Sequence, residues 1–150
     1  MTSTSPPAPL DGVLEAAIYA SDIDAAEAFY GSVLGLPKVL RAGNRHVFFR
    51  AGNTIVLVFN PADTELPASN PALPVPPHGA RGPGHLCLSA EGREMDLWRA
   101  HLEASGVEIE ADFRWPNGAR SLYFRDPAGN SIEIAEPALW FGARGSQGPA

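Results

Sequence analysis

The segment Ser121-Leu-Tyr-Phe-Arg125, followed closely by Gly129-Asn-Ser-Ile132, decides the fold because the chain contains a second version of it. That version reads His46-Val-Phe-Phe-Arg50 and then Gly52-Asn-Thr-Ile55. A short apolar stretch and a proline follow in both places. Chance could produce one such similarity, but the common order of the segments indicates that one structural unit occurs twice.

Each unit is predicted to contain a strand, a helix and three more strands. In the first unit, Ser21 or Asp22 supplies an N-cap oxygen, and Gly35 suits the left-handed position that ends a helix. Gly106 has the same place in the second unit. Apolar residues recur at helical spacing between these ends, and short apolar runs follow. Strands are expected at 13–20, 37–42, 45–50, 53–59, 83–89, 107–114, 120–125 and 130–136, and the second helix at 93–105.

The chain divides into two modules, a linker and two tails. Residues 12–60 form the first module and residues 83–138 the second. Residues 61–82 are rich in proline, which is unsuited to helices and interior strands, so an extended linker is expected. Residues 1–11 and 139–150 are expected to be flexible tails. The predicted fold is α+β, with two βαβββ modules that arose by tandem duplication.

Composition and charge exclude several classes of protein. A chain of 150 residues with 45% apolar and 19% charged residues fits one globular domain. Its net charge of −6 opposes binding to nucleic acid. No apolar run approaches the roughly 18 residues of a membrane span, and the N-terminus lacks the features of a secretory signal. The single cysteine, Cys87, allows neither an internal disulfide nor a cysteine-based zinc site. A cytoplasmic location is expected.

Three potential metal ligands stand on strand faces that oppose the apolar faces. Because side chains alternate along a strand, Glu133 lies opposite two isoleucines and His85 opposite two leucines. Glu15 has a similar place in the opening strand. An enclosed carboxylate is costly unless it is paired or binds a metal, and a divalent cation also relieves the repulsion between two carboxylates. If the three strands meet, these side chains could hold one divalent cation.

Five motifs accompany the repeat: Glu15-Ala-Ala-Ile-Tyr-Ala-Ser-Asp22, Phe29-Tyr30, Leu34-Gly35-Leu36, Gly84-His85 and Asp126-Pro-Ala-Gly-Asn-Ser-Ile-Glu133. Over roughly residues 12–138, the chain resembles the vicinal oxygen chelate superfamily. This group includes glyoxalases, fosfomycin-resistance transferases, extradiol dioxygenases and bleomycin-binding proteins. The resemblance implies the glyoxalase/bleomycin-resistance/dioxygenase fold, in which the modules form a curved mixed sheet around a cavity.

In metal-binding members of that superfamily, the ligands come from the first and last strands of each unit. The resemblance therefore assigns Glu15, His85 and Glu133 as ligands of one divalent metal ion. In the first unit, Val56 is aligned with Glu133, so a fourth, glyoxalase-like ligand is missing. The set is then similar to that of the fosfomycin-resistance transferases. Two carboxylates and one imidazole favour Mn²⁺ or Fe²⁺, with Zn²⁺, Ni²⁺ and Mg²⁺ as alternatives.

Further residues are candidates for the same cavity. Glu15 could act as an unliganded base instead of a ligand, and Tyr123 is a second candidate catalytic residue. Arg120 could make a bidentate contact with an anionic substrate. A structural role is the alternative for each of these side chains. The candidate substrate-binding residues are Arg120, Ser121, His46, Trp115 and His78.

The sequence and the resemblance favour a metal-dependent enzyme that acts on a small substrate chelated through adjacent oxygens. Isomerase, lyase, transferase and dioxygenase chemistry all remain open. The alternative is a metal-free protein of the bleomycin-resistance type that sequesters a drug or metabolite. A homodimer is expected by analogy with small relatives, and the modules pair either within one chain or across the dimer. Neither nucleic acid nor a membrane is an expected partner.

Overall fold

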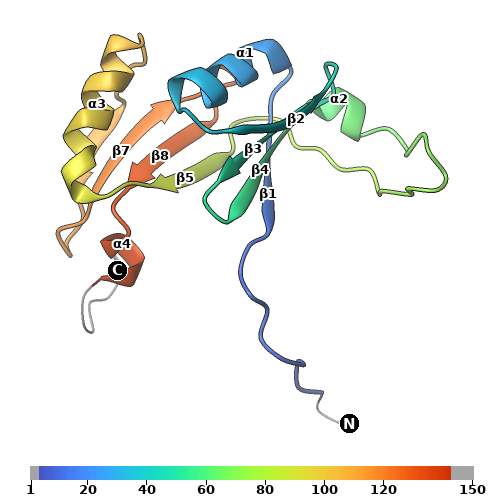
Figure 1. Cartoon of the computed structure of the whole chain (residues 1–150), viewed down its shortest axis with the longest axis horizontal. Helices are drawn as coiled ribbons and strands as arrows, with labels where there is room; N and C mark the ends of the chain where they lie inside the picture. Colours follow the sequence, from blue (N-terminus) through green and yellow to red (C-terminus); the bar gives the residue numbers. More distant parts are fainter. Residues whose placement is uncertain (1–3, 143–150) are drawn as a thin grey trace.

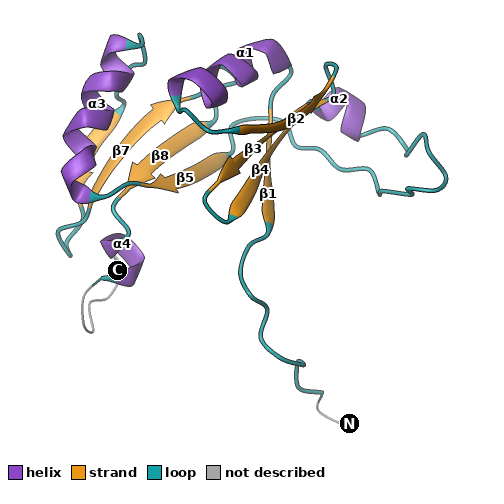
Figure 2. Ribbon diagram, viewed as in Figure 1, coloured by secondary structure: helices purple, strands orange, loops and turns teal. Residues whose placement is uncertain are grey.

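The structure, a computed structural model that describes residues 4–142, contains two modules of the same architecture (Figure 1). Each module folds into its own four-stranded mixed sheet. Figure 2 shows the strands of both sheets with the longer helices beside them. The structure confirms the predicted α+β fold with two βαβββ modules, and the mixed sheet takes the form of two separate four-stranded sheets.

The first module contains β1 (Glu15–Tyr19), α1 (Ile23–Glu27), η1 (Ala28–Val33), β2 (Lys38–Ala42), β3 (His46–Ala51) and β4 (Thr54–Phe59). Of the two candidate N-caps, Asp22 is the one used, since its Oδ1 accepts a hydrogen bond from the Ala25 N–H at 3.0 Å. The helix widens into the π-helix η1, in which the Leu34 N–H donates to the Phe29 carbonyl at 2.9 Å. Gly35, with φ at 69°, follows it in the left-handed conformation. The strand order is β1-β4-β3-β2.

The second module contains β5 (His85–Ser89), η2 (Gly92–Glu94), α3 (Met95–Ala104), β6 (Ala111–Arg114), β7 (Arg120–Arg125) and β8 (Ser131–Ala135). Its strand order, β5-β8-β7-β6, repeats that of the first module. In both modules the first strand is parallel to the last, while the other neighbours are antiparallel. Each module therefore places its opening strand directly beside its closing strand.

One hydrophobic core joins the two modules. Tyr30 and Phe49 of the first module belong to the same fully buried cluster as Leu102 and Phe124 of the second. The rings of Phe29 and Phe124, one from each module, lie 6.2 Å apart between centroids. Burial of large apolar side chains is worth about 1.5–3 kcal/mol each. Because the two modules bury these side chains against each other, they form one domain.

A buried polar link also crosses between the modules. The Tyr30 hydroxyl donates to Oδ2 of Asp126 at 2.7 Å. Asn130 Nδ2 donates to the same carboxylate oxygen and to the Tyr19 carbonyl, both at 2.9 Å, while its Oδ1 accepts from the Gly84 N–H at 2.8 Å. Burial, together with the charge of Asp126, raises the pKa of Tyr30, so its hydroxyl remains a donor. The turn between β7 and β8 thus fixes the start of both β5 and β8.

The expectation that the linker contains no helix is wrong at its first residues. Pro61–Thr64 form the short helix α2, with Asn60 as N-cap, whose side chain accepts from the Ala62 N–H at 3.1 Å. Proline suits this first position because it has no N–H to leave unpaired. From residue 65 to residue 84 no helix or strand occurs, and most side chains are exposed.

The two ends of the domain differ from each other. Residues 4–14 are exposed and form no helix or strand. At the other end, the predicted boundary at residue 138 is corrected, because Ala138–Phe141 form helix α4. Leu139 is 3% exposed and packs with Ala119 and Ala135. Residues 1–3 and 143–150 of the predicted tails lie outside the described residues. No helix within residues 4–142 is long and apolar enough to cross a membrane.

Candidate functional site

Glu133 is a buried carboxylate in the middle of the second sheet. It belongs to β8, between β5 and β7, and is 4% exposed. Its neighbours in the sequence, Ile132 and Ile134, belong to the core, so Glu133 points to the other face of the sheet, as predicted from the alternation. The Ser121 hydroxyl on β7 donates to Glu133 Oε2 at 2.6 Å. A carboxylate in such a place needs positively polarised neighbours.

His85 supplies the nearest of these neighbours. Its Nδ1 lies 3.0 Å from the Ser131 carbonyl, which can only accept, so Nδ1 carries the ring proton. Its Nε2 lies 3.3 Å from Glu133 Oε1. In a neutral imidazole with that tautomer, Nε2 has a lone pair, and two electron-rich atoms would face each other. A proton on Nε2 or a metal ion near both atoms removes this repulsion, so the donor set suits a cation.

Ser121 and Trp115 lie behind the carboxylate. Ser121 is fully buried, and its oxygen accepts a hydrogen bond from Trp115 Nε1 at 2.8 Å. The indole is packed against Ala119, Ala135 and Leu139, so α4 holds it in place. A fully buried hydroxyl cannot touch a substrate directly. The structure therefore brings both predicted residues to the site, but behind Glu133 and not on a substrate surface.

Tyr123 and Cys87 flank Glu133 on the neighbouring strands and on the same face. In the sheet register, Glu133 pairs with Cys87 on β5 and with Tyr123 on β7. Burial, followed by the charge of Glu133, raises the pKa of both groups to about 12. Tyr123 thus stays protonated at neutral pH and suits the role of hydrogen-bond donor, not of base. The Cys87 thiol stays protonated as well, which makes it a poor nucleophile.

Glu15 does not reach this group within one chain. It is exposed at the start of β1 in the first sheet and forms no ion pair with any described residue. Within residues 4–142, no three or more histidine, cysteine, aspartate or glutamate side chains are arranged to hold a metal ion. The structure therefore brings together His85 and Glu133, and Glu15 as their co-ligand stays a prediction.

The alignment of Val56 with Glu133 is corrected by the sheet register. Glu133 pairs with Tyr123, and the corresponding pair in the first sheet is Phe48 with Leu57. Val56 instead points into the core and is 2% exposed. A shift of one residue turns a side chain to the opposite face of the sheet. Because leucine is no more a ligand than valine, the absence of a fourth ligand at this position still holds.

His46 and His78 lie in an aromatic cluster on the first sheet, away from Glu133. The imidazole of His46 stacks on Phe48 with 4.2 Å between ring centroids, and both histidines meet the ring of Phe59 edge-on. His78 Nδ1 is 2.7 Å from the Tyr19 hydroxyl. His46 Nδ1 is buried without a partner among the described residues, and burial lowers the pKa of this histidine. The cluster gives the first sheet an apolar, aromatic face.

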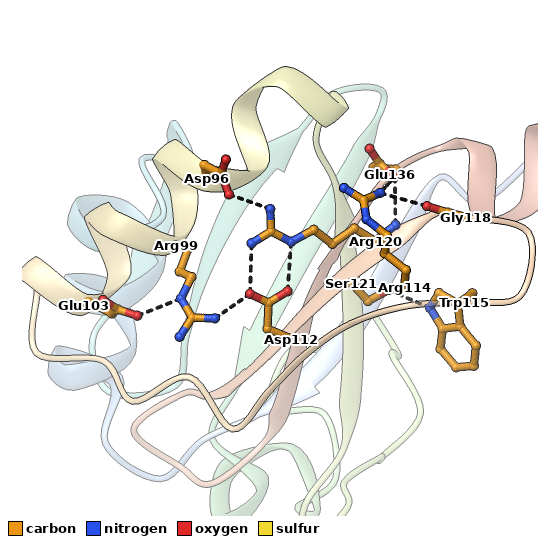
Figure 3. A network of polar contacts seen from close by, with 10 residues as sticks. All are labelled: Asp96, Arg99, Glu103, Asp112, Arg114, Trp115, Gly118, Arg120, Ser121 and Glu136. Carbon is orange, nitrogen blue, oxygen red and sulfur yellow. Dashed lines mark hydrogen bonds and ion pairs between the residues drawn. The ribbon is translucent and has the colours of Figure 1, made fainter.

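Arg120, predicted to bind an anionic substrate, is oriented the other way. It alternates with Ser121, so it points toward α3 (Figure 3). Its guanidinium makes a bidentate contact with Asp112, at 2.8 and 2.9 Å, and a third bond to Asp96 at 2.6 Å. Arg99 contacts Asp112 as well. All of these partners belong to a structural network on the helix side, so the predicted substrate contact is wrong.

Two further groups at the site escaped the sequence analysis. Phe113 on β6 lies beside Tyr123 with parallel rings, 5.8 Å between centroids and 2° between planes. The His85 ring lies on the other side of Tyr123, at 6.1 Å and 16°. Strand alternation in β6 would have placed Phe113 on this face once the register was known. The Ser131 carbonyl, which fixes the His85 tautomer, is a backbone group and leaves no signal in the sequence.

Comparisons with known proteins agree with this geometry. The family model described as "Glyoxalase/Bleomycin resistance protein/Dioxygenase superfamily" matches residues 12–134. Comparison with curated proteins gave no significant match. Among solved structures, a lactoylglutathione lyase from Agrobacterium tumefaciens is similar at 45% identity and a TM-score of 0.84, covering 89% of this chain and 98% of that one.

Two more distant structures share the fold. A superfamily member from Sphaerobacter thermophilus DSM 20745 is 26% identical, with a TM-score of 0.64 and coverage of 85% of this chain and 98% of that one. A glyoxalase/dioxygenase from Nostoc punctiforme is 24% identical, with a TM-score of 0.65 and coverage of 90% and 97%. The duplicated modules and the His85–Glu133 pair on the open face of the second sheet agree with the family match, which covers most of the chain. The protein therefore belongs to the glyoxalase/bleomycin resistance protein/dioxygenase superfamily.

Proposed function

We propose that the protein is a divalent-metal-dependent enzyme acting on a small substrate through adjacent oxygens, by isomerase, lyase, transferase or dioxygenase chemistry. The observation that carries the proposal is the approach of His85 Nε2 to Glu133 Oε1 at 3.3 Å. The other nitrogen of His85 and the other oxygen of Glu133 are already engaged. Mn²⁺ or Fe²⁺ suits such donors best, with Zn²⁺, Ni²⁺ or Mg²⁺ as alternatives. Such an ion would supply Lewis-acid chemistry at the substrate oxygens.

The similarity to a lactoylglutathione lyase supports an enzyme over a binding protein. It also makes lactoylglutathione the first compound to assay. Within the site, the protonated Tyr123 hydroxyl would donate a hydrogen bond to a bound oxygen, and its pairing with Glu133 on the same face supports this role. The rings of Phe113 and Tyr123 would form the wall against which the substrate lies.

Glu15 completes the site from a second copy of the chain. In the sheet registers, Glu15 occupies the position in β1 that His85 occupies in β5. Two protein ligands alone hold a metal ion weakly, and residues 4–142 of one chain offer no group of three. In a two-fold symmetric homodimer, the first sheet of one copy would face the second sheet of the other, twice over. Glu15 then serves as third ligand or as base. A cytoplasmic location remains part of the proposal.

The first test is metal binding by protein freed of metal, measured by titration calorimetry with Mn²⁺, Fe²⁺ (without oxygen), Ni²⁺, Zn²⁺ and Mg²⁺. The proposal expects about one ion per chain, and loss of binding in both His85→Ala and Glu133→Gln. Glu108→Gln is the matched control, since Glu108 is an exposed carboxylate of the same module outside the site. Wild-type protein that binds none of these ions would refute the metal-dependent enzyme.

A mixing experiment tests the shared site. Glu15→Gln and His85→Ala homodimers each carry two damaged sites. If each site takes Glu15 from one chain and His85 from the other, a hybrid dimer has one intact site and one doubly damaged site. Mixing the two variants and allowing exchange should therefore restore binding to a fraction of the sites. If the mixture still binds no metal after subunit exchange has been demonstrated, either all ligands come from one chain or Glu15 is not a ligand.

The second candidate function is sequestration of a small molecule without metal. The observation that favours it is the lack of a three-ligand group among the described residues of one chain, together with the aromatic face around His46 and Phe48. The metal titration separates the two functions. A protein that fails to bind metal, yet binds aromatic compounds with micromolar affinity, would be a sequestering protein of the bleomycin-resistance type.

A further inference from the structure

A row of three side chains runs from the edge of the second sheet to the buried carboxylate. Trp115 Nε1 lies 2.8 Å from Ser121 Oγ, and Ser121 Oγ lies 2.6 Å from Glu133 Oε2. Ser121 is fully buried, and Glu133 is 4% exposed. The backbone hydrogen bonds between β7 and β8 join these strands already, so the row is an addition to the pairing of the sheet.

The direction of both hydrogen bonds is fixed by chemistry. An indole N–H can only donate, so the Ser121 oxygen must accept from Trp115. The single hydroxyl proton of Ser121 is then directed to Glu133, whose Oε2 accepts it. Glu133 Oε2 is thereby held in place as the acceptor of this bond. Short bonds between a hydroxyl and a carboxylate belong to the stronger class of hydrogen bond.

The indole that anchors the row is itself immobilised. Its ring packs on Ala119, Ala135 and Leu139, the last of which comes from α4. The backbone of Trp115 closes the turn before β7. Its N–H donates to the Ala119 carbonyl and its carbonyl accepts from the Gly118 N–H, both at 2.8 Å. The anchor of the row therefore lies on rigid backbone and not on a loose loop.

We infer that Trp115 and Ser121 are positioning residues that engage one oxygen of Glu133 and leave Oε1 alone to face His85 and the bound ion. The inference rests on the proposed function for the ion, but the hydrogen-bonded row itself does not. The Ser121 hydroxyl withdraws charge from Oε2, so Oε1 becomes the better donor to the ion and binding through one oxygen is favoured. Binding through one oxygen keeps additional positions on the ion open for substrate. Partners of this kind behind a ligand are worth about 10–100-fold in metal affinity.

The test titrates Co²⁺ into metal-free full-length protein and follows the visible spectrum. The variants are Ser121→Ala, which removes both bonds, Trp115→Phe, which removes only the outer bond, and Ser89→Ala as control. Ser89 lies on β5 on the same face, two residues beyond the Cys87 that pairs with Glu133. We expect Ser121→Ala to weaken Co²⁺ binding about 10–100-fold and to change the spectrum, because Oε2 becomes free to bind. Trp115→Phe should have a smaller effect, and Ser89→Ala none.

A second readout needs no metal. The indole N–H resonance of Trp115, assigned by its loss in Trp115→Phe, should shift in Ser121→Ala and also in Glu133→Gln, since the amide oxygen polarises the Ser121 hydroxyl less than a carboxylate does. Wild-type affinity and spectrum in Ser121→Ala would overturn the inference while the proposed function stands. Wild-type protein that binds neither Co²⁺ nor any ion of the first test would refute the proposed function. The resonance of Trp115 alone then tests the hydrogen-bonded row: a shift in Glu133→Gln supports it, and an unchanged resonance overturns it.

Discussion

Replacement of Asp112 by asparagine should destabilise the protein strongly at neutral pH and hardly at all in acid. Asp112 is 17% exposed and receives both arms of Arg120, which is 15% exposed. Hydrogen bonds from Arg120 and Arg99 lower the pKa of Asp112 from 3.8 to about 2. At 1.36 kcal/mol for each pKa unit, and after a reduction for partial solvent screening, the carboxylate stabilises the fold by about 2 kcal/mol.

The sign of the pH dependence follows from the lowered pKa. The carboxylate is charged in both states above pH 4, so its full contribution is present there, and it is lost as the pH falls from about 4 to 2. Urea unfolding followed by tryptophan fluorescence should give a difference of about 2 kcal/mol between wild type and Asp112→Asn at pH 7, shrinking steadily below pH 4. Asp96→Asn is the control, because Asp96 contacts the same Arg120 but is 90% exposed. Equal effects of both substitutions, or a difference that does not change with pH, would refute the reasoning.

Three further predictions concern polar side chains and a thiol. Tyr30→Phe removes the hydroxyl that donates to Asp126 and should lower the free energy of unfolding, measured by urea denaturation, by about 2 kcal/mol. An unchanged free energy would contradict this. Tyr19→Phe, which removes a partly exposed hydrogen bond, is the control and should have a smaller effect. His46→Phe removes a buried nitrogen that has no partner among the described residues, so it should raise the melting temperature above pH 7. Because burial lowers the pKa of His46, the wild type loses stability as the pH falls below 6.5, and the gain in the variant should be larger there. A lower melting temperature in the variant would refute the prediction. Cys87 should react slowly with iodoacetamide at pH 8, because the pKa of its thiol is about 12, and faster in Glu133→Gln; equal rates would show that Glu133 does not influence the thiol.

The order of elements and the strand faces of His85 and Glu133 could be predicted from the sequence because both depend on local rules. The N-cap at Asp22 and the glycine at Gly35 mark the ends of the first helical segment, and the structure uses both. Alternation along β8 and β5 placed Glu133 and His85 on the face opposite the apolar residues. Neither inference required knowledge of which strands are neighbours.

The errors arose where an answer depends on distant partners or on loop length. Val56 was aligned with Glu133 because both follow a similar Gly-Asn turn. The turn between β3 and β4 has residues 52–53 only, whereas residues 126–130 separate β7 from β8, so the register shifts and Leu57 is the true counterpart. The partners of Arg120 lie on another strand and on a helix, and no local pattern shows them.

The core shared by the two modules gives the exposed middle of the linker, residues 66–76, an entropic role. Residues 65–84 form no helix or strand, while rings from both modules meet in one buried cluster. A tether of this kind sets the effective concentration at which the halves meet, in the millimolar range for a short flexible chain, and doubling its length costs only about 0.6 kcal/mol. Severed between residues 66 and 76, the chain would become a bimolecular system whose halves reassemble in a concentration-dependent manner, which makes this protein suited to fragment complementation.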